Sequence, residues 1–303
     1  MESADKWSDY WLKEGQQGEV FVNQDGHKHP QLADYWRTQF SGIIPKAKVI
    51  DIAAGGGSIF TDIDTTEIDL AATDLSLPAL QLLKGRIPAT NCIVTNSEHM
   101  PFSNQSFQLV VSQFGVEYAG IDAFPEAARL VASGGRLAIL CHISNGYIDS
   151  RTRGELEGIE TVRISQFIRH AIDLTNAVYS GSAALFQQAE ANFIPAERQL
   201  SGMVKKQPQG VHAHLYGGFR QLFERRNNYL EEDIIHWLTA MQGDLIRNFE
   251  RLSTMKEAAQ DEQQVREVCK TLQKTGLRHV GYSPFQLEGH DKPLAWSITA
   301  ERP

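Results

Sequence analysis

Three consecutive glycines, Gly55 to Gly57, follow a short apolar run and lie between two acidic residues, Asp51 and Asp74. A turn of small residues lets a bound nucleoside lie against the backbone, and an acid that ends the next strand accepts hydrogen bonds from ribose hydroxyls. A carboxylate such as that of Asp51 within this loop would repel a pyrophosphate and attract an ammonium group. The pattern therefore predicts a site for a nucleoside that carries an ammonium group, rather than for a dinucleotide.

Three polar residues that could act on a second substrate follow two further apolar runs. Glu117 and Tyr118 come after the run at 107–112, and His142 ends the run at 136–142. Ligands lie beyond the carboxyl ends of parallel strands, so these side chains are placed to orient or deprotonate an acceptor. An imidazole with a pKa of about 6.5 accepts protons at neutral pH, which makes His142 the preferred base. A structural, hydrogen-bonded role stays open for each of the three.

The segments that must position these residues alternate between short apolar runs and stretches of helical character. Between residues 48 and 143 this alternation predicts βαβ units and a parallel sheet. The predicted strands of this region are 47–54, 67–74, 92–95, 107–112 and 136–142. A helix at 262–275 precedes two closing strands at 277–287 and 293–300. The residues between these strands, Gly289 to Lys292, suit an antiparallel hairpin.

Long amphipathic patterns replace the apolar runs between residues 149 and 256. These patterns predict a set of helices inserted into the sheet domain. Pro195, Pro208 and the pair Gly217-Gly218 interrupt the patterns, and they predict turns between successive helices.

Composition disfavours several classes of protein. Lys and Arg number 29 against 37 Asp and Glu, and the net charge of −8 disfavours a nucleic-acid-binding surface over the whole chain. The longest apolar stretches are far shorter than the roughly 20 residues of a membrane span. The first residues have neither the basic nor the apolar segment of a signal peptide. The three cysteines form no CxxC pair, and no metal site is predicted. We expect a cytoplasmic protein.

The glycine turn resembles the first motif of the class I S-adenosylmethionine-dependent methyltransferases, in which an acidic residue precedes glycines at alternate positions. Ala53 stands where the first glycine of that family usually stands, and Gly55 and Gly57 occupy the other two places. Asp74 matches the acid with which the family binds ribose. The ammonium group of S-adenosylmethionine also suits the carboxylate of Asp51.

Three further segments, in the right order and spacing, extend the resemblance over residues 47–142. The segment 95–102 matches the one that recognises adenine in the family, with Asn96 in place of the usual Asp. The side-chain oxygen of Asn96 can still accept a hydrogen bond. Residues 106–112 resemble the motif of the fourth strand, and residues 133–137 resemble the glycine pair before the fifth strand.

The resemblance implies that S-adenosylmethionine is the cofactor and S-adenosylhomocysteine the product. The residues implied to bind it are Asp51, Ala53, Ala54, Gly55, Gly57, Asp74, Leu75, Asn96, Ser97, Glu98, Gln113 and Phe114. It also implies an enzyme that transfers a methyl group to a small organic acceptor by in-line displacement at the sulfonium, which requires mainly alignment and an apolar enclosure. The candidates for catalysis are His142, Glu117 and Tyr118, and the acceptor atom stays open.

The fold implied by the resemblance is α/β, a three-layer Rossmann-like domain with a seven-stranded, mostly parallel sheet and an antiparallel C-terminal hairpin. We expect this domain to cover residues 46–148 and 257–303, with an N-terminal helical cap at 1–45. The helical insertion at 149–256 follows the fifth strand and is expected to form a lid over the acceptor. The aromatic pairs Tyr10-Trp11 and Tyr35-Trp36 of the cap are expected to close over the cofactor.

Other functions of the same residues stay open. A regulatory or sensor protein would bind S-adenosylmethionine without turnover, and a variant of the fold could use the pocket for carboxyl transfer or decarboxylation. A nicotinamide-dependent dehydrogenase is disfavoured by Asp51. The expected partner is a small-molecule acceptor, and a homodimer is left open.

Overall fold

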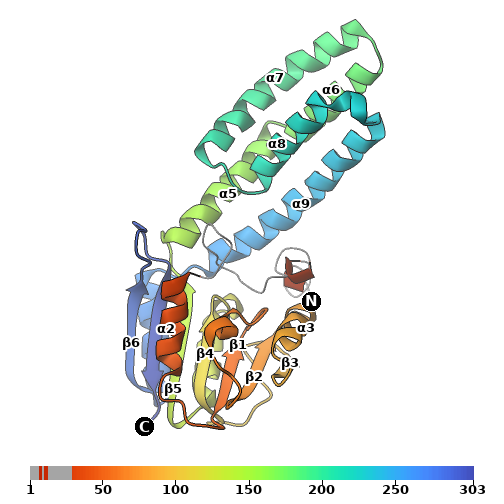
Figure 1. The fold of residues 1–303 in the computed structure, drawn as a ribbon. Coiled ribbons are helices and arrows are strands. Elements are labelled where there is room, and N and C mark those ends of the chain that lie inside the picture. Colours follow the sequence, from red (N-terminus) through yellow and green to blue (C-terminus); the bar gives the residue numbers. More distant parts are fainter. Residues whose placement is uncertain (1–6, 9, 13–28) are drawn as a thin grey trace. The chain divides into compact units, whose positions relative to one another are not determined.

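The structure is a computed structural model that describes residues 7, 8, 10–12 and 29–303. The chain divides into two compact units, one formed by residues up to 149 together with 257–303, and one formed by residues 150–256. The first unit contains the sheet, and the second is helical (Figure 1).

Seven strands of the described chain form one sheet in the order β3-β2-β1-β4-β5-β7-β6. The strands are β1 Lys48–Ile52, β2 Asp69–Asp74, β3 Asn91–Val94, β4 Phe107–Gln113, β5 Val131–His142, β6 Arg278–Phe285 and β7 Ala295–Glu301. Strand β1 pairs in parallel with β2 and β4, and parallel pairing continues outward to β3 and β5. Strand β7 runs antiparallel to both β5 and β6. The predicted mostly parallel sheet with an antiparallel C-terminal hairpin is confirmed.

Helices pack on both faces of this sheet because its strands alternate buried apolar side chains between two cores. The helices of the first unit are α2 Pro30–Phe40, α3 Leu77–Arg86, α4 Ala123–Leu130 and α10 Glu262–Lys274. Val49 and Leu109 pack with α2 on one face, whereas Ile50 and Val110 pack with α4 and α10 on the other. Burial of each such side chain stabilises the fold by about 1.5–3 kcal/mol. The result is the three-layer arrangement that the sequence predicts.

The helix after β2 begins where its sequence predicts. The hydroxyl of Ser76 is the N-cap of α3 and accepts a hydrogen bond from the backbone N–H of Ala79 at 3.3 Å. Pro78 lies in the first turn, where its missing N–H costs nothing. This start to the helix holds Asp74, the last residue of β2, at the carboxyl edge of the sheet.

The second unit has an apolar core of its own, in which Phe167, Phe219 and Leu238 are buried. Figure 1 shows its helices running alongside one another. The helices that contribute to it are α5 Tyr147–Ile164, α6 Phe167–Tyr179, α7 Ala183–Lys206, α8 Val211–Glu224 and α9 Glu231–Ala258.

Two of the three predicted interruptions in this unit are wrong. Pro208 does lie in the turn between α7 and α8, but Pro195 lies within α7 and Gly217-Gly218 within α8. A Cβ on Gly218 would come within 2.4 Å of the Trp237 ring, so this glycine allows α8 and α9 to pack closely. Pro195 costs α7 about 3 kcal/mol of helix stability, but burial of nearby side chains such as Leu200 offsets that cost.

Most of the predicted N-terminal cap at 1–45 lies outside the described residues. Within the described part, α2 buries Leu32 and Trp36 against the sheet. The extent of the cap and its role as a separate part stay predictions.

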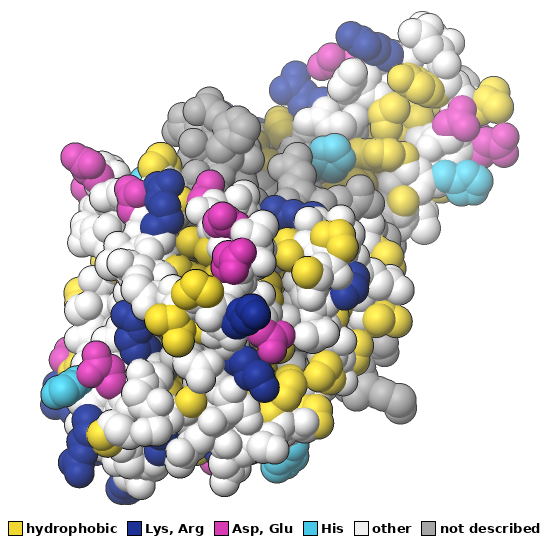
Figure 2. Space-filling view, turned by 60° about the horizontal axis from the view of Figure 1, so that its bottom comes forward, with side chains coloured by type: hydrophobic (Ala, Val, Ile, Leu, Met, Phe, Trp, Pro, Cys, Tyr) yellow, Lys and Arg dark blue, Asp and Glu magenta, His cyan; other side chains and the backbone are white. Residues whose placement is uncertain are grey.

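None of the helices in the described part of the chain is both long and apolar enough to cross a membrane. Figure 2 shows one face of the molecule, on which basic and acidic side chains are interspersed.

Candidate functional site

The turn after β1 holds backbone conformations that few side chains adopt. The φ angle is +54° at Ala53 and +53° at Gly55. The left-handed conformation costs Ala53 about 1–2 kcal/mol, which the surrounding structure must offset. Gly115, in the turn after β4, approaches so closely that a Cβ on it would lie 2.6 Å from the Cβ of Ala53. The turns after β1 and β4 therefore pack backbone against backbone.

Asp74 links this turn to the start of α3. Its Oδ2 accepts a hydrogen bond from the backbone N–H of Gly55 at 2.9 Å, and its Oδ1 accepts one from Ser76 at 2.8 Å. Burial raises the pKa of Asp74, and hydrogen bonds from the backbone N–H groups of Ser76, Gly55 and Leu75 oppose that rise. A carboxylate has about four lone-pair sites, so Asp74 can accept a hydrogen bond from one further hydroxyl beyond these three backbone bonds.

The residues predicted to contact a base lie after β2 and β3. The side chain of Leu75 is 39% exposed and offers an apolar surface beside Asp74. Asn96 closes its own turn, since its Oδ1 accepts from the backbone N–H of Glu98 at 3.1 Å and its Nδ2 donates to Glu98 Oε2 at 2.6 Å. Ser97 is buried inside that turn. Recognition of adenine by Asn96 stays a prediction.

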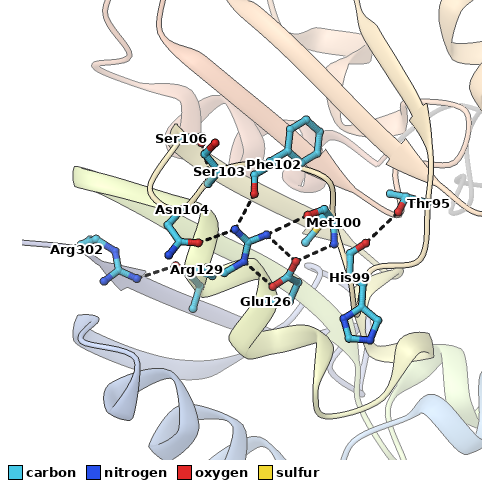
Figure 3. Close-up of polar contacts among 11 residues, drawn as sticks. Thr95, His99, Met100, Phe102, Ser103, Asn104, Ser106, Glu126, Arg129 and Arg302 are labelled. Atoms are coloured by element: carbon cyan, nitrogen blue, oxygen red, sulfur yellow. Dashed lines mark hydrogen bonds and ion pairs between the residues drawn. The ribbon is translucent and has the colours of Figure 1, made fainter.

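An arginine holds the chain directly after this segment (Figure 3). The guanidinium of Arg129 donates to the carbonyl oxygens of Phe102 at 2.7 Å and Met100 at 3.1 Å, and to Asn104 Oδ1 at 2.8 Å. It also binds both carboxylate oxygens of Glu126 at 2.7 Å. Glu126 in turn accepts from the backbone N–H of Met100 at 2.8 Å. We call Arg129 and Glu126 the α4 clamp, because this pair joins α4 to the loop at 100–104.

Two tryptophans near the N-terminus contact the same edge of the sheet. Trp11 is buried against the glycine turn, where a Cβ on Gly55 would lie 2.3 Å from ring atom Cζ2. The ring of Trp7 packs edge-on against Tyr118, with 5.1 Å between centroids. The prediction that Tyr35-Trp36 closes over the cofactor differs from the structure at Trp36, a residue of α2 whose side chain is buried in the core between that helix and the sheet.

The remaining residues of the predicted cofactor set are buried. Asp51 lies in β1 itself rather than in the turn that follows, paired in register with Ala72 of β2 and Val111 of β4. The amide of Gln113 accepts a hydrogen bond from the indole N–H of Trp36 and donates to Ser58 Oγ at 2.9 Å. This amide is therefore engaged within the fold.

Three further residues of the predicted cofactor set are Ala54, Gly57 and Phe114. Ala54 donates its backbone N–H to the carbonyl of Thr73 at 2.8 Å, which ties the glycine turn to β2. Gly57 has a φ of +81° and begins the short 3₁₀ helix at Ser58–Asp62. Phe114 has a φ of +52° and is buried after β4.

The predicted catalytic residues Glu117 and His142 form a buried pair. Glu117 Oε1 lies 2.7 Å from His142 Nδ1, and it also accepts the backbone N–H of His142 at 2.9 Å. The rings of Phe114 and Tyr118 lie 4.8 Å and 5.6 Å from the imidazole. Burial and the charge of Glu117 raise the pKa of the Cys141 thiol well above its usual range, so this thiol stays protonated. The structure thus brings together three residues that the sequence nominates separately.

A cavity of about 290 Å³ lies elsewhere, beside segments that precede β1 and β2. Its walls include Ile43, Ile44 and Ile68. Because ligand sites of parallel sheets form beyond the carboxyl ends of the strands, this cavity is not part of the candidate site. Within the described ranges, no group of three or more His, Cys, Asp or Glu residues is arranged to hold a metal ion.

The sequence reasoning missed Gly115 and the α4 clamp. A glycine directly after a predicted buried strand is a signal of close backbone approach, and it could have indicated Gly115. The i,i+3 spacing of Glu126 and Arg129 indicates an ion pair on one helix. It gives no sign of the carbonyl groups that Arg129 also binds, since these come from another segment.

The family described as "Methyltransferase domain" matches residues 50–139. This match runs from β1 into β5 and includes the glycine turn, Asp74 and Asn96. The chain carries a class I S-adenosylmethionine-dependent methyltransferase domain. The predicted membership of this family is thereby confirmed, and the carboxyl edge just described belongs to the methyltransferase domain.

The curated relatives match about a third of this chain. The demethylmenaquinone methyltransferase of Renibacterium salmoninarum is 31% identical over 100 residues, which are 32% of this chain and 42% of that protein. The demethylmenaquinone methyltransferase of Paenarthrobacter aurescens is 33% identical over 94 residues, 30% of this chain and 37% of that protein. The chain thus spans about two fifths of the length of these curated relatives. Among solved structures, geranyl diphosphate C-methyltransferase from Streptomyces coelicolor has 14% identity and a TM-score of 0.39 over 47% of this chain and 65% of that one.

Proposed function

We propose that this protein transfers a methyl group from S-adenosylmethionine to a small organic acceptor. The observation that carries the proposal is the place of Asp74. Its carboxylate ends β2, accepts the Gly55 N–H at 2.9 Å, and so lies against the left-handed turn after β1. An acid in this position next to such a turn is suited to a hydroxyl of a ribose.

The other residues of this edge fit the same ligand. Leu75 offers an exposed apolar surface to an adenine ring, and Asn96 keeps a lone pair on Oδ1 for its amino group. We assign Asp51 to the ammonium of the methionine part, because a carboxylate in β1 attracts a positive charge at the adjacent turn. Trp11, buried against Gly55, excludes water from the turn.

When bound, S-adenosylmethionine supplies an electrophilic methyl group on a sulfonium. The chain has to align an acceptor with that methyl and keep water away from both. We assign the second task in part to the helical unit at 150–256 as a substrate lid, because this unit follows β5 directly and β5 ends at His142.

A small acceptor is supported by the matched relatives, which are named for demethylmenaquinone. The net charge of −8 also agrees better with a small molecule than with a nucleic acid. Binding without turnover would favour a regulatory protein, and release of carbon dioxide from an acceptor would favour the decarboxylation variant.

The experiment uses the full chain with S-adenosylmethionine that is isotopically labelled on its methyl group. A mixture of hydroxylated aromatics, amines and carboxylic acids is added, and labelled products are separated by mass. We expect one class of acceptor to gain the label while S-adenosylhomocysteine forms in equal amount. Folded protein that binds neither S-adenosylmethionine nor S-adenosylhomocysteine would overturn the proposal.

A further inference from the structure

The imidazole of His142 has one nitrogen bound and one nitrogen unpartnered. A carboxylate oxygen only accepts hydrogen bonds, so the contact with Glu117 Oε1 at 2.7 Å places the proton of the neutral ring on Nδ1. The lone pair then lies on Nε2, which has no hydrogen-bond partner among the described residues. His142 is 2% exposed and Glu117 is 3% exposed. A buried polar atom without a partner costs about 1–3 kcal/mol, and an acceptor hydroxyl that donates to Nε2 would remove this cost.

The walls around this imidazole are aromatic. The Phe114 ring is tilted at 4.8 Å from it, and the Tyr118 ring meets it edge-on at 5.6 Å. Trp7 packs edge-on against Tyr118, with 5.1 Å between ring centroids. Aromatic rings in these orientations favour another planar ring. Such walls suit an aromatic or enolic acceptor better than a charged, freely hydrated one.

His142 and Glu117 also lie at the carboxyl edge of the sheet, where a base that acts on the acceptor is expected. His142 ends β5, and Phe114 follows β4, whose turn packs against the turn after β1 at Gly115 and Ala53. The imidazole is therefore on the same carboxyl edge as the glycine turn. A base on this edge can reach an acceptor that is aligned with the methyl group.

We propose that His142 Nε2 is the general base that removes the hydroxyl proton of a phenolic or enolic acceptor, with Glu117 as its positioning residue. This inference rests on the proposed function. The proton moves from the acceptor hydroxyl to Nε2, and the oxygen lone pair forms the new O–CH₃ bond. The C–S bond breaks and its electron pair stays on sulfur. The Glu117 carboxylate stabilises the imidazolium that results, and the proton then passes to solvent.

The chemistry of other acceptors explains why this class is favoured. A phenol with a pKa of about 10 is almost fully protonated at neutral pH, so a base accelerates its methylation by about 10²–10⁴-fold. A carboxylic acid is already ionised at neutral pH and needs no base. Its negative charge would also be repelled by the buried Glu117 carboxylate.

The first test compares two phenols of different acidity, 1-naphthol and 4-nitrophenol, with aniline and benzoate as other acceptor classes. We expect the wild type to methylate the phenols and not benzoate. His142→Asn should lower kcat for 1-naphthol by about 10²–10⁴-fold. The loss should be smaller for 4-nitrophenol, which is more acidic and depends less on a base for removal of its proton. The affinity for S-adenosylmethionine should change less than twofold.

Glu117→Gln separates the two residues of the pair. Glu117 Oε1 accepts both the backbone N–H and the Nδ1 proton of His142, so the amide oxygen of a glutamine would take over both bonds and leave the ring tautomer unchanged. The substitution removes only the negative charge that stabilises the imidazolium. We expect a loss in kcat that is clear but smaller than that of His142→Asn, because the base remains and only its charge stabilisation is lost. The matched control is His279→Asn, since His279 also pairs with a glutamate, Glu301 at 2.9 Å, but on the exposed face of β6. This control should keep the wild-type rate.

A second readout does not depend on turnover. Nitrogen-15 NMR of the imidazoles should show His142 protonated on Nδ1 both in the wild type and in Glu117→Gln. The absorbance of 4-nitrophenol bound to the S-adenosylhomocysteine complex should show more phenolate with the wild type than with His142→Asn.

The outcomes separate this inference from the proposed function. Failure to bind S-adenosylmethionine overturns the proposed function and the inference together. Binding with transfer to aniline or benzoate but to neither phenol overturns the inference alone. Equal losses for the two phenols in His142→Asn, or an Nε2-protonated ring in the wild type, also overturn it. Binding without transfer to any of these acceptors overturns the assigned acceptor class.

Discussion

Asp74 Oδ2 accepts a hydrogen bond from the backbone N–H of Gly55 at 2.9 Å, across the carboxyl ends of β2 and β1. One carboxylate thus joins two parts of the cofactor edge, a left-handed turn and the start of α3 at Ser76. The same carboxylate is the group that we assign to the ribose, so the geometry of the turn and the affinity for the cofactor depend on one side chain.

Asp74→Ala should weaken binding of S-adenosylmethionine by about 10-fold or more, because a hydrogen bond to a charged group contributes about 1.5–3 kcal/mol. Calorimetric titration of the full chain measures this change. Asp74→Asn keeps one acceptor oxygen and should lose less. Asp69→Asn, at the exposed start of β2, is the matched control and should bind as the wild type does. Unchanged affinity in a folded Asp74→Ala protein would contradict the assignment.

Gly55→Ala should destabilise the first unit, for two reasons. The φ of +53° costs alanine about 1–2 kcal/mol, and the new methyl would meet the Trp11 ring at 2.3 Å. Gly85→Ala is the matched control, since Gly85 lies in α3 with open space around it, and alanine there should stabilise by up to about 1 kcal/mol. Urea unfolding measures both variants. The destabilisation caused by Gly55→Ala should be smaller in a Trp11→Ala background. Equal changes in stability for Gly55→Ala and Gly85→Ala would argue against this packing.

Arg129→Lys should loosen the loop at 100–104 and lower affinity for the cofactor's adenine. A lysine ammonium cannot reproduce the planar fork that binds Met100, Phe102 and Glu126 at once (Figure 3). We expect a loss of about 1–3 kcal/mol in stability, with faster amide hydrogen exchange in the loop. Arg163→Lys, in an exposed pair with Glu160, should change stability by less than about 0.5 kcal/mol. Wild-type exchange rates in Arg129→Lys would show that the loop does not depend on the clamp.

His212 should make the stability of the second unit depend on pH. It is buried, with Nε2 at 2.9 Å from the Gln207 carbonyl oxygen. Burial lowers its pKa, and the Gln207 bond and the charge of Glu155 oppose that shift. Below a pH of about 6.5 the unfolded chain binds more protons at this residue than the folded one. The contribution of His212 to the free energy of unfolding should therefore be complete above that pH. It should decrease as the pH is lowered toward the pKa of His212 in the folded protein.

Thermal unfolding between neutral and mildly acidic pH tests this contribution. His212→Asn should reduce the slope with which the stability falls toward acidic pH. His236→Asn, on the exposed side of α9, should keep the wild-type slope. An unchanged slope in His212→Asn would mean that other groups cause the dependence.

The fold was largely predictable because its signals are local. The start of α3 follows from Ser76 and Pro78, and the sheet follows from short apolar runs separated by turns and helical stretches. Pro195 and Gly218 were assigned wrongly because contacts between helices outweigh local propensity, as the Trp237 ring packed against Gly218 shows.

The sequence predicts which residues belong to the candidate site better than it predicts the contacts between them. Glu117 and His142 both follow strands, but their hydrogen bond joins positions 25 residues apart, and no periodicity indicates it. The carbonyl partners of Arg129 are equally remote in sequence. Such pairings depend on how the turns pack, which only the folded chain shows.

The most direct test of the central claim is calorimetric titration of the full chain with S-adenosylmethionine and S-adenosylhomocysteine, with NAD as the control. We predict micromolar binding of the first two ligands and none of NAD. Binding of NAD, or of none of the three by folded protein, would contradict the assignment of this carboxyl edge to S-adenosylmethionine.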